Sequence, residues 1–263
     1  MLRQPFHGRL ILPNITSLNP KRPSLYLYRP TSMRSESSTS QNNNFFEYTS
    51  GRWIRDETQQ MLRRYRQFNV EALKKVSAEA CGAQTVVGIE KIAEGSYNKI
   101  FNIKVDNGKE VIARIPTPLA GPDHLVTASE VATMDYIRSL GVPIPRVLAW
   151  CSNASSTPVE SEYIIMEKAQ GIELGRVWDK MTPKLRNHTV LEWVAIERLQ
   201  MQPILGGYGS IFYRGDLEPQ NSLELCTAGD LDERFVLGPN IRPAFWKDGR
   251  RMMNIDRGPC MCR

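Results

Sequence analysis

The sequence predicts an α+β protein in which a small antiparallel sheet and one main helix precede a second, mostly helical part. An Asn-Gly pair at 107–108 separates two runs rich in β-branched residues, which is a strong hairpin signal because both turn residues tolerate positive φ. From residue 86 to 166 the order of elements is three strands, one helix and two strands. Thr182 and Pro183 then form a typical helix start, with Thr as the N-cap.

Each element follows from the spacing of its apolar residues. Residues 52–80 alternate apolar and basic side chains and predict one or two amphipathic helices. Gly141 ends the main helix, and the chain beyond Gly206 is rich in loop residues, with one short strand at 210–213. The other expected elements are strands over 86–89, 100–105, 111–115, 147–150 and 163–166, and helices over 127–140 and 185–201.

The positive charge of the chain is concentrated in its first 40 residues. The net charge is +6, and the leader, residues 1–40, carries +5 of it, which leaves about +1 for the remainder. We therefore do not expect nucleic acid as a partner. A leader rich in Arg and Ser and poor in acids is typical of an organelle transit peptide, although a disordered polar terminus without an address has a similar composition.

Composition predicts a soluble protein of a reducing compartment. Apolar residues make up 41% and charged residues 24% of the 263 residues, and no apolar run approaches the roughly 18 residues that a membrane span needs. The five cysteines are scattered and odd in number, which argues against a disulfide framework.

Two features between residues 94 and 130 suggest phosphate binding. Gly95 lies in a turn between the first two strands, where a missing Cβ lets backbone N–H groups approach a phosphate. Arg114, on the third strand, could neutralise phosphate charge while Glu130 on the following helix holds it by an ion pair. Taken separately, these features also fit an ordinary hairpin turn and ordinary solvated charges.

The order of these elements resembles the N-terminal lobe of the protein-kinase-like phosphotransferases of the aminoglycoside phosphotransferase and choline kinase type. The resemblance implies a kinase-like N-lobe with a partial C-lobe, ATP and Mg²⁺ as cofactors, and a small-molecule hydroxyl as the acceptor. Residues 163–167 resemble the last N-lobe strand and the hinge. The residues implied to bind the nucleotide are Gly95, Ser96, Asn98, Arg114, Glu130 and Glu167.

Residues 46–53, 113–116 and 255–259 are similar to fungal mitochondrial members of this family, which implies that the leader directs the chain to mitochondria. At Arg114 the broader family usually has Lys, and Arg grips phosphate with a different geometry. The expected organisation is a transit peptide or disordered leader over 1–40, a helical extension over 45–80, an N-lobe over 81–168 and a truncated C-lobe over 169–263.

Asp216 and Asn221 have the spacing of a catalytic base and a metal-binding amide in this family, and Asp256 could be its metal-binding Asp. A surface turn explains the same residues, and the 40 positions between the two aspartates are many for a short connecting hairpin. No metal ligand is assigned. The resemblance implies ATP-dependent phosphotransfer, but the catalytic loop is not intact in this chain, which we expect to be inactive alone. The alternative is a non-catalytic nucleotide-binding or protein-interaction module, as a degenerate or truncated copy.

Overall fold

A computed structural model of the chain describes residues 44–201, 204–205, 207–227, 231–247 and 249–261, so the predicted leader at 1–40 lies outside the described residues. All described residues belong to one of the two units into which the chain divides, Ser37–Arg263. The helices are α2 (Glu57–Leu62), α3 (Val70–Ala80), α4 (Leu125–Ser139), α5 (Leu174–Val177) and α6 (Pro183–Gln200). The longer strands are β1 (Val86–Glu94), β2 (Asn98–Val105), β3 (Glu110–Pro116), β4 (Val147–Cys151), β5 (Tyr163–Glu167), β8 (Ser210–Tyr213), β9 (Leu223–Thr227) and β10 (Leu231–Gly238). Two-residue strands complete the described set: β6 (Ile204–Leu205), β7 (Gly207–Tyr208) and β11 (Cys260–Met261).

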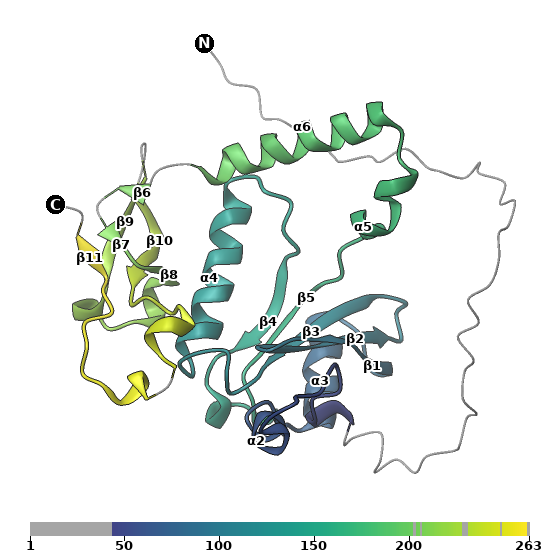
Figure 1. The fold of residues 1–263 in the computed structure, drawn as a ribbon, viewed down its shortest axis with the longest axis horizontal. Coiled ribbons are helices and arrows are strands. Elements are labelled where there is room, and N and C mark those ends of the chain that lie inside the picture. Colours follow the sequence, from purple (N-terminus) through teal and green to yellow (C-terminus); the bar gives the residue numbers. More distant parts are fainter. Residues whose placement is uncertain (1–43, 202–203, 206, 228–230, 248, 262–263) are drawn as a thin grey trace, which may run out of the picture. The chain divides into compact units, whose positions relative to one another are not determined.

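A five-stranded sheet with the order β1-β2-β3-β5-β4 lies at the centre of the view in Figure 1. All its neighbouring strands are antiparallel. Strands β2 and β3 meet in the predicted hairpin, where Gly108 has a φ of 80° and the Asn107 side chain accepts a hydrogen bond from Lys109 N. The expected antiparallel sheet and its Asn-Gly hairpin are therefore confirmed.

Residue alternation along β2 and β3 gives this sheet two different faces. Phe101 and Ile103 of β2 share one face with Ala113 and Ile115 of β3, and all four are fully buried in one hydrophobic cluster with Leu73 of α3. The other face carries the even-numbered residues, Arg114 among them. Helix α3 thus covers the apolar face, and the polar residues of β3 point to the opposite side.

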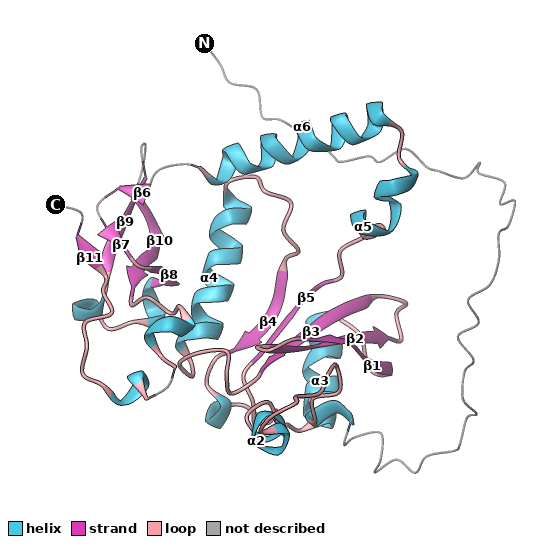
Figure 2. Ribbon diagram, viewed as in Figure 1, coloured by secondary structure: helices cyan, strands magenta, loops and turns pink. Residues whose placement is uncertain are grey.

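Helix α4 lies against the five-stranded sheet on one side and a second, four-stranded sheet on the other (Figure 2). It covers nearly the predicted range, and Gly141 follows it with a φ of 92°. Ala132 and Tyr136 pack against Phe235 and Leu237 of the second sheet. Both faces of α4 are therefore occupied by sheets.

The second sheet has the order β6-β9-β10-β8 and was only partly expected. Its strand β8 matches the strand predicted at 210–213, but the loop prediction for the following residues was wrong because β9 and β10 form there. Three of the first four β10 residues are charged. Its later residues Phe235 and Leu237 are buried in a cluster that includes Ala132 and Tyr136 of α4.

Helix α6 begins as predicted, since the Thr182 side chain accepts a hydrogen bond from Leu185 N and Pro183 occupies the first helical position. None of its residues is buried. Leu191 and Trp193 are 67% and 61% exposed, so the apolar stripe of this helix lies open.

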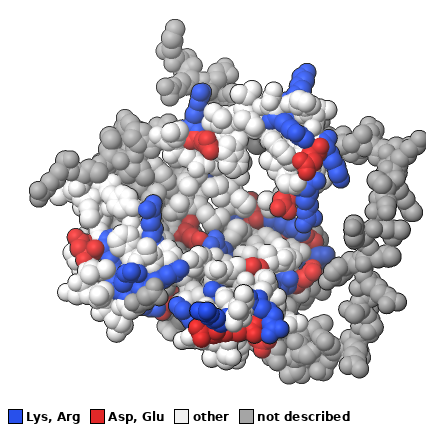
Figure 3. Space-filling view, in the orientation of Figure 1, with Lys and Arg blue, Asp and Glu red and all other residues white. Residues whose placement is uncertain are grey.

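The predicted α+β, kinase-like fold class is confirmed by these elements together with the family match reported below. Within the described part of the chain, no helix combines the length and the apolar character needed to cross a membrane. On the face drawn in Figure 3, acidic side chains accompany basic ones in each part of the described surface.

Candidate nucleotide-binding site

The turn between β1 and β2, residues 95–97, is held by hydrogen bonds that use its carbonyl groups. Gly95 N donates to Asn98 O at 2.9 Å, closing the turn. Thr117, just after β3, donates from its hydroxyl to Ser96 O at 3.0 Å and from its backbone N to Tyr97 O at 2.8 Å. Among the described residues, no partner accepts a hydrogen bond from the N–H groups of Ser96 and Tyr97. The turn therefore offers two donors while its carbonyls are occupied.

Gly95 itself borders open space. A Cβ built on it would meet no described atom within 4 Å, and its φ is not in the left-handed region. The fold therefore does not require glycine at this position. A close approach by a ligand is a physical reason for the missing side chain.

Arg114 forms the predicted ion pair with Glu130 of α4. Their side chains are 23% and 29% exposed, so the pair lies at a partly buried position between the sheet and the helix. The Nε–H of Arg114 is buried and has no hydrogen-bond partner among the described residues. A guanidinium with an unused buried donor fits a phosphate oxygen.

The charge of Glu130 depends on Arg114. Burial raises the pKa of the Glu130 carboxyl above its ordinary value, and the guanidinium of Arg114 opposes this change. The planar guanidinium of Arg114 thus lies on β3, and its orientation is fixed by the Glu130 side chain of α4.

Arg114 lies two residues along β3 from Pro116, which pairs beside the turn. In the register of β2 and β3, Arg114 is opposite Ile100 and Pro116 is opposite Asn98, the first β2 residue after the turn. Two residues along a strand span about 7 Å, and residues two apart share a face. Arg114 therefore lies about 7 Å along β3 from the residue that pairs beside the turn, which is comparable to the length of a triphosphate chain.

Glu167, expected at the hinge, is directed toward β4. Its carboxylate accepts a hydrogen bond from Arg146 N at 3.1 Å and pairs with Arg146 Nε at 3.4 Å, and its own N–H donates to Arg146 O. Glu167 borders a cavity of about 670 Å³ that is also lined by Cys81 and Lys109. Neither Arg114 nor the glycine turn lines this cavity.

The two candidate catalytic residues are not joined to the Arg114–Glu130 pair by any hydrogen bond or ion pair within the described residues. Asp216 lies in a 3₁₀ turn at residues 214–216, where burial raises the pKa of its carboxyl and nearby His124 opposes the change. One of its oxygens is buried without a partner. Asn221 is exposed at the end of the next 3₁₀ turn.

Asp256 has a local structural role, since its carboxylate accepts a hydrogen bond from Gly258 N at 2.8 Å. Over the described ranges, no group of three or more His, Cys, Asp or Glu side chains could hold a metal ion.

Two groups of site residues were missed by sequence reasoning. Thr117 holds the turn through two hydrogen bonds, and no local pattern marks it. Glu94 and Lys99 are the β1 and β2 residues that pair directly across the turn, and they form an ion pair at 3.1 Å. Opposite charges flanking a predicted turn are a readable cross-strand signal, and they could have predicted this pair.

Comparison with known proteins shows what this chain is similar to. Residues 88–199 match the sequence model of the phosphotransferase enzyme family. A subtelomeric hrmA-associated cluster protein of Aspergillus fumigatus is 42% identical over 173 residues, which are 65% of this chain and 33% of the relative. Altered inheritance of mitochondria protein 9, mitochondrial, of Yarrowia lipolytica is 27% identical over 240 residues, which cover 82% of this chain and 41% of that protein. The protein of the same name from Komagataella phaffii is 22% identical over 295 residues, or 91% and 48%.

The chain spans about a third to a half of the length of these curated relatives. Several fungal relatives carry a mitochondrial name, which supports the mitochondrial localisation predicted from the leader and the motifs. The resemblance predicted from the motifs is confirmed: residues 88–199 match the phosphotransferase enzyme family, and the fungal mitochondrial proteins are among the relatives of this chain.

Proposed function

We propose that this chain supplies the nucleotide-binding lobe of a mitochondrial ATP-dependent phosphotransferase acting on a small-molecule hydroxyl. The observation that carries the proposal is a set of unused donors in the β1–β2 turn and on the neighbouring strand β3. The N–H groups of Ser96 and Tyr97 and the Nε–H of Arg114 have no partner among the described residues. A triphosphate is the ligand of matching charge and length in this family.

In this proposal the turn, Arg114 and Glu130 have different roles in nucleotide binding. The turn at 95–97 binds phosphate oxygens through backbone N–H groups, and Arg114 neutralises their charge. Glu130 orients Arg114 and does not touch the nucleotide. Bound Mg²⁺ would shield the phosphate charge further, and its ligands are not assigned here.

Titration with MgATP tests the proposal. A ligand at a hundred times its Kd stabilises the folded chain by about 2.7 kcal/mol, so a thermal-shift series at millimolar MgATP should raise the Tm of the parent. Arg114→Gln should weaken MgATP binding by about tenfold or more, because a charge-assisted contact to phosphate is lost. Gly95→Ala should weaken binding without lowering the Tm of the free chain, since its Cβ meets no described atom.

Lys104→Gln is a charge-matched control. Lys104 lies on β2, the strand that pairs with the β3 strand of Arg114; it is 56% exposed and pairs with Glu110 far from the turn. Its variant should bind MgATP like the parent. No stabilisation of the parent at millimolar MgATP, or equal losses in Arg114→Gln and Lys104→Gln, would refute the proposal.

The second candidate function is a non-catalytic nucleotide-binding or protein-interaction module. It is favoured by the position of Asp216, which neighbours His124 and has no bond to the Arg114–Glu130 pair. Asp216→Asn separates the two candidates: in the phosphotransferase it abolishes ATP turnover, if Asp216 is the base. Turnover equal to the parent would remove Asp216 from catalysis, and nucleotide binding without any turnover in the parent would favour the second candidate.

A further inference from the structure

A buried ion pair lies at the base of the glycine turn, on the face of the sheet opposite to Arg114. Lys99 shares its face of β2 with Phe101 and Ile103, and its side chain is 0% exposed. Glu94, its partner at the end of β1, is 1% exposed. Because residues 94 and 99 flank the turn directly, any shift of this pair moves the turn itself.

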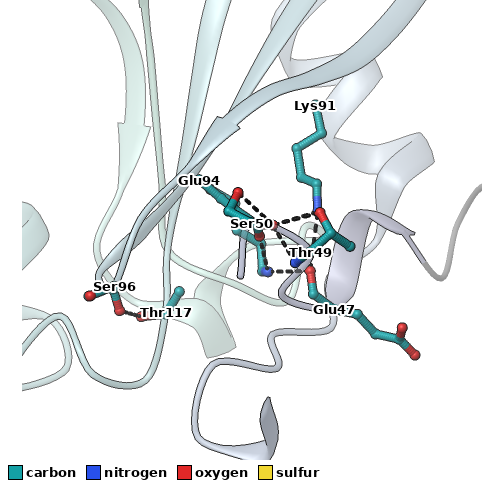
Figure 4. Close-up of polar contacts among 8 residues, drawn as sticks. Glu47, Thr49, Ser50, Lys91, Glu94, Ser96 and Thr117 are labelled. Carbon is teal, nitrogen blue, oxygen red and sulfur yellow. Dashed lines mark hydrogen bonds and ion pairs between the residues drawn. The ribbon is translucent and has the colours of Figure 1, made fainter. Parts of the chain in front are cut away.

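The partners of this pair come from an N-terminal segment, residues 47–50, which we call the strap (Figure 4). Thr49 donates from its backbone N and its hydroxyl, the latter at 2.7 Å, to Glu94 Oε1, and Ser50 adds a third donor at 3.3 Å. The carbonyl of Glu47 accepts from Lys99 Nζ at 2.8 Å. Both charges at the base of the turn are thus satisfied by the strap.

The strap is anchored in the core beneath the sheet. The ring of Phe45 packs edge-to-face on Phe101 at 5.3 Å, and the ring of Phe46 does the same on Phe68 at 5.2 Å. Lys91 of β1 donates to Glu47 O at 3.2 Å and to Thr49 Oγ1 at 3.0 Å. These contacts fix the position of Thr49 relative to the β1–β2 strands.

The hydrogen bonds from the strap stabilise the negative charge of Glu94. Burial alone would raise the pKa of Glu94, but the hydrogen bonds from Thr49 and Lys99 outweigh it and lower the pKa to about 2. Burial lowers the pKa of Lys99, and the Glu94 carboxylate opposes that change. Without Thr49, the carboxylate would lose two of its donors although its own side chain is 1% exposed.

The turn is therefore held by two separate sets of hydrogen bonds. Thr117, just after β3, binds the carbonyls of Ser96 and Tyr97, and the strap binds the pair that closes the turn (Figure 4). What remains free is the set of N–H donors that the proposed function uses.

We propose that the strap sets the glycine turn in its phosphate-binding conformation, with Thr49 as the positioning residue that acts through Glu94. This inference rests on the proposed function for its effect on nucleotide binding. It makes nucleotide affinity dependent on a segment outside the sheet, 45 residues from the turn in sequence. The competing view is that the strap stabilises the fold and leaves the turn unchanged.

Thr49→Val tests the inference, because valine keeps the shape and the backbone N–H and removes only the hydroxyl. Thr49→Ser restores the hydroxyl. Thr85→Val is the matched control, since Thr85 also donates from its backbone N and its hydroxyl to one carboxylate, that of Asp106, at the other end of the same strands.

Two readouts are measured on the full chain: MgATP affinity, and hydrogen–deuterium exchange of a peptide covering residues 92–100, which contains the turn and the bonded amide of Gly95. Thr49→Val should weaken MgATP binding by about fivefold to tenfold and speed exchange in that peptide, as expected for loss of a bond to a charged group. Thr49→Ser should restore both values, and Thr85→Val should change neither.

The outcomes separate this inference from the proposed function. Unchanged exchange and affinity in Thr49→Val, or changes equal to those in Thr85→Val, overturn the role of the strap while nucleotide binding by the parent stands. If the parent does not bind MgATP, the proposed function fails. The exchange measurement then decides the conformational part by itself: faster exchange at 92–100 only in Thr49→Val supports it, and equal exchange overturns it.

Discussion

The buried Glu94–Lys99 pair should respond very differently to removal of its two members. Glu94 accepts at both carboxylate oxygens: Oε1 faces donors from Thr49 and Ser50 and pairs with Lys91 at 3.3 Å, and Oε2 takes Lys99. Glu94→Gln leaves one acceptor oxygen for these two groups of donors, so an NH₂ group must face a donor. It also removes the negative charge that faces the buried Lys99 ammonium, whose other described acceptor is the neutral Glu47 carbonyl. We expect a loss of about 3 kcal/mol in the free energy of unfolding.

Lys99→Met should cost only about 1 kcal/mol, because it removes a buried charge and leaves Glu94 with its donors from the strap. Urea unfolding followed by circular dichroism gives both free energies, and the double variant Glu94→Gln/Lys99→Met should be more stable than Glu94→Gln alone. A loss in Lys99→Met as large as that in Glu94→Gln would refute the reasoning, since it would mean that Lys99 does not depend on Glu94 for its charge.

Three further predictions concern pH, the core and the open helix. The pKa of Glu94 lies at about 2 against an ordinary value of 4.5, so its contribution of about 3 kcal/mol to the free energy of unfolding should be present above pH 4.5 and lost as the pH falls toward 2. Urea unfolding across this range should show a steeper decline of that free energy in the parent than in Glu94→Gln. Parallel declines would contradict the assignment. Phe101→Ala should lower the free energy of unfolding by about 3–5 kcal/mol because the ring is fully buried, and a loss below about 1 kcal/mol would place that ring outside the core. Leu191→Lys with Trp193→Lys should reduce light scattering by concentrated protein and change the unfolding free energy by less than about 0.5 kcal/mol each, whereas unchanged scattering would show that α6 does not drive association.

The part of the fold that could be predicted from sequence has local causes. The Asn107-Gly108 pair specifies its own turn geometry, so the β2–β3 hairpin needed no knowledge of distant residues. The contact between Arg114 and Glu130 followed from the order of strands and helix, because the helix after β3 returns along the sheet. Thr182 and Pro183 likewise fixed the start of α6.

The parts that could not be predicted depend on contacts across long stretches of chain. Strand β10 begins with charged residues, and its later residues Phe235 and Leu237 are buried only because Tyr136 of α4 packs on them. The contact between Thr49 and Glu94 joins residues 45 positions apart, and no local pattern in the helical extension indicated it. Asp216 and Asn221, which have a catalytic spacing, lie in two successive 3₁₀ turns, and their catalytic role stays a prediction.

The central claim is that a triphosphate lies between the glycine turn and Arg114, and an NMR titration of the chain with MgATP tests it most directly. The claim predicts that saturation with MgATP shifts the amide resonances of Ser96 and Tyr97 together with the Nε–H resonance of Arg114. Saturable binding that leaves these three resonances in place and shifts those around Glu167 and Lys109 instead would contradict it.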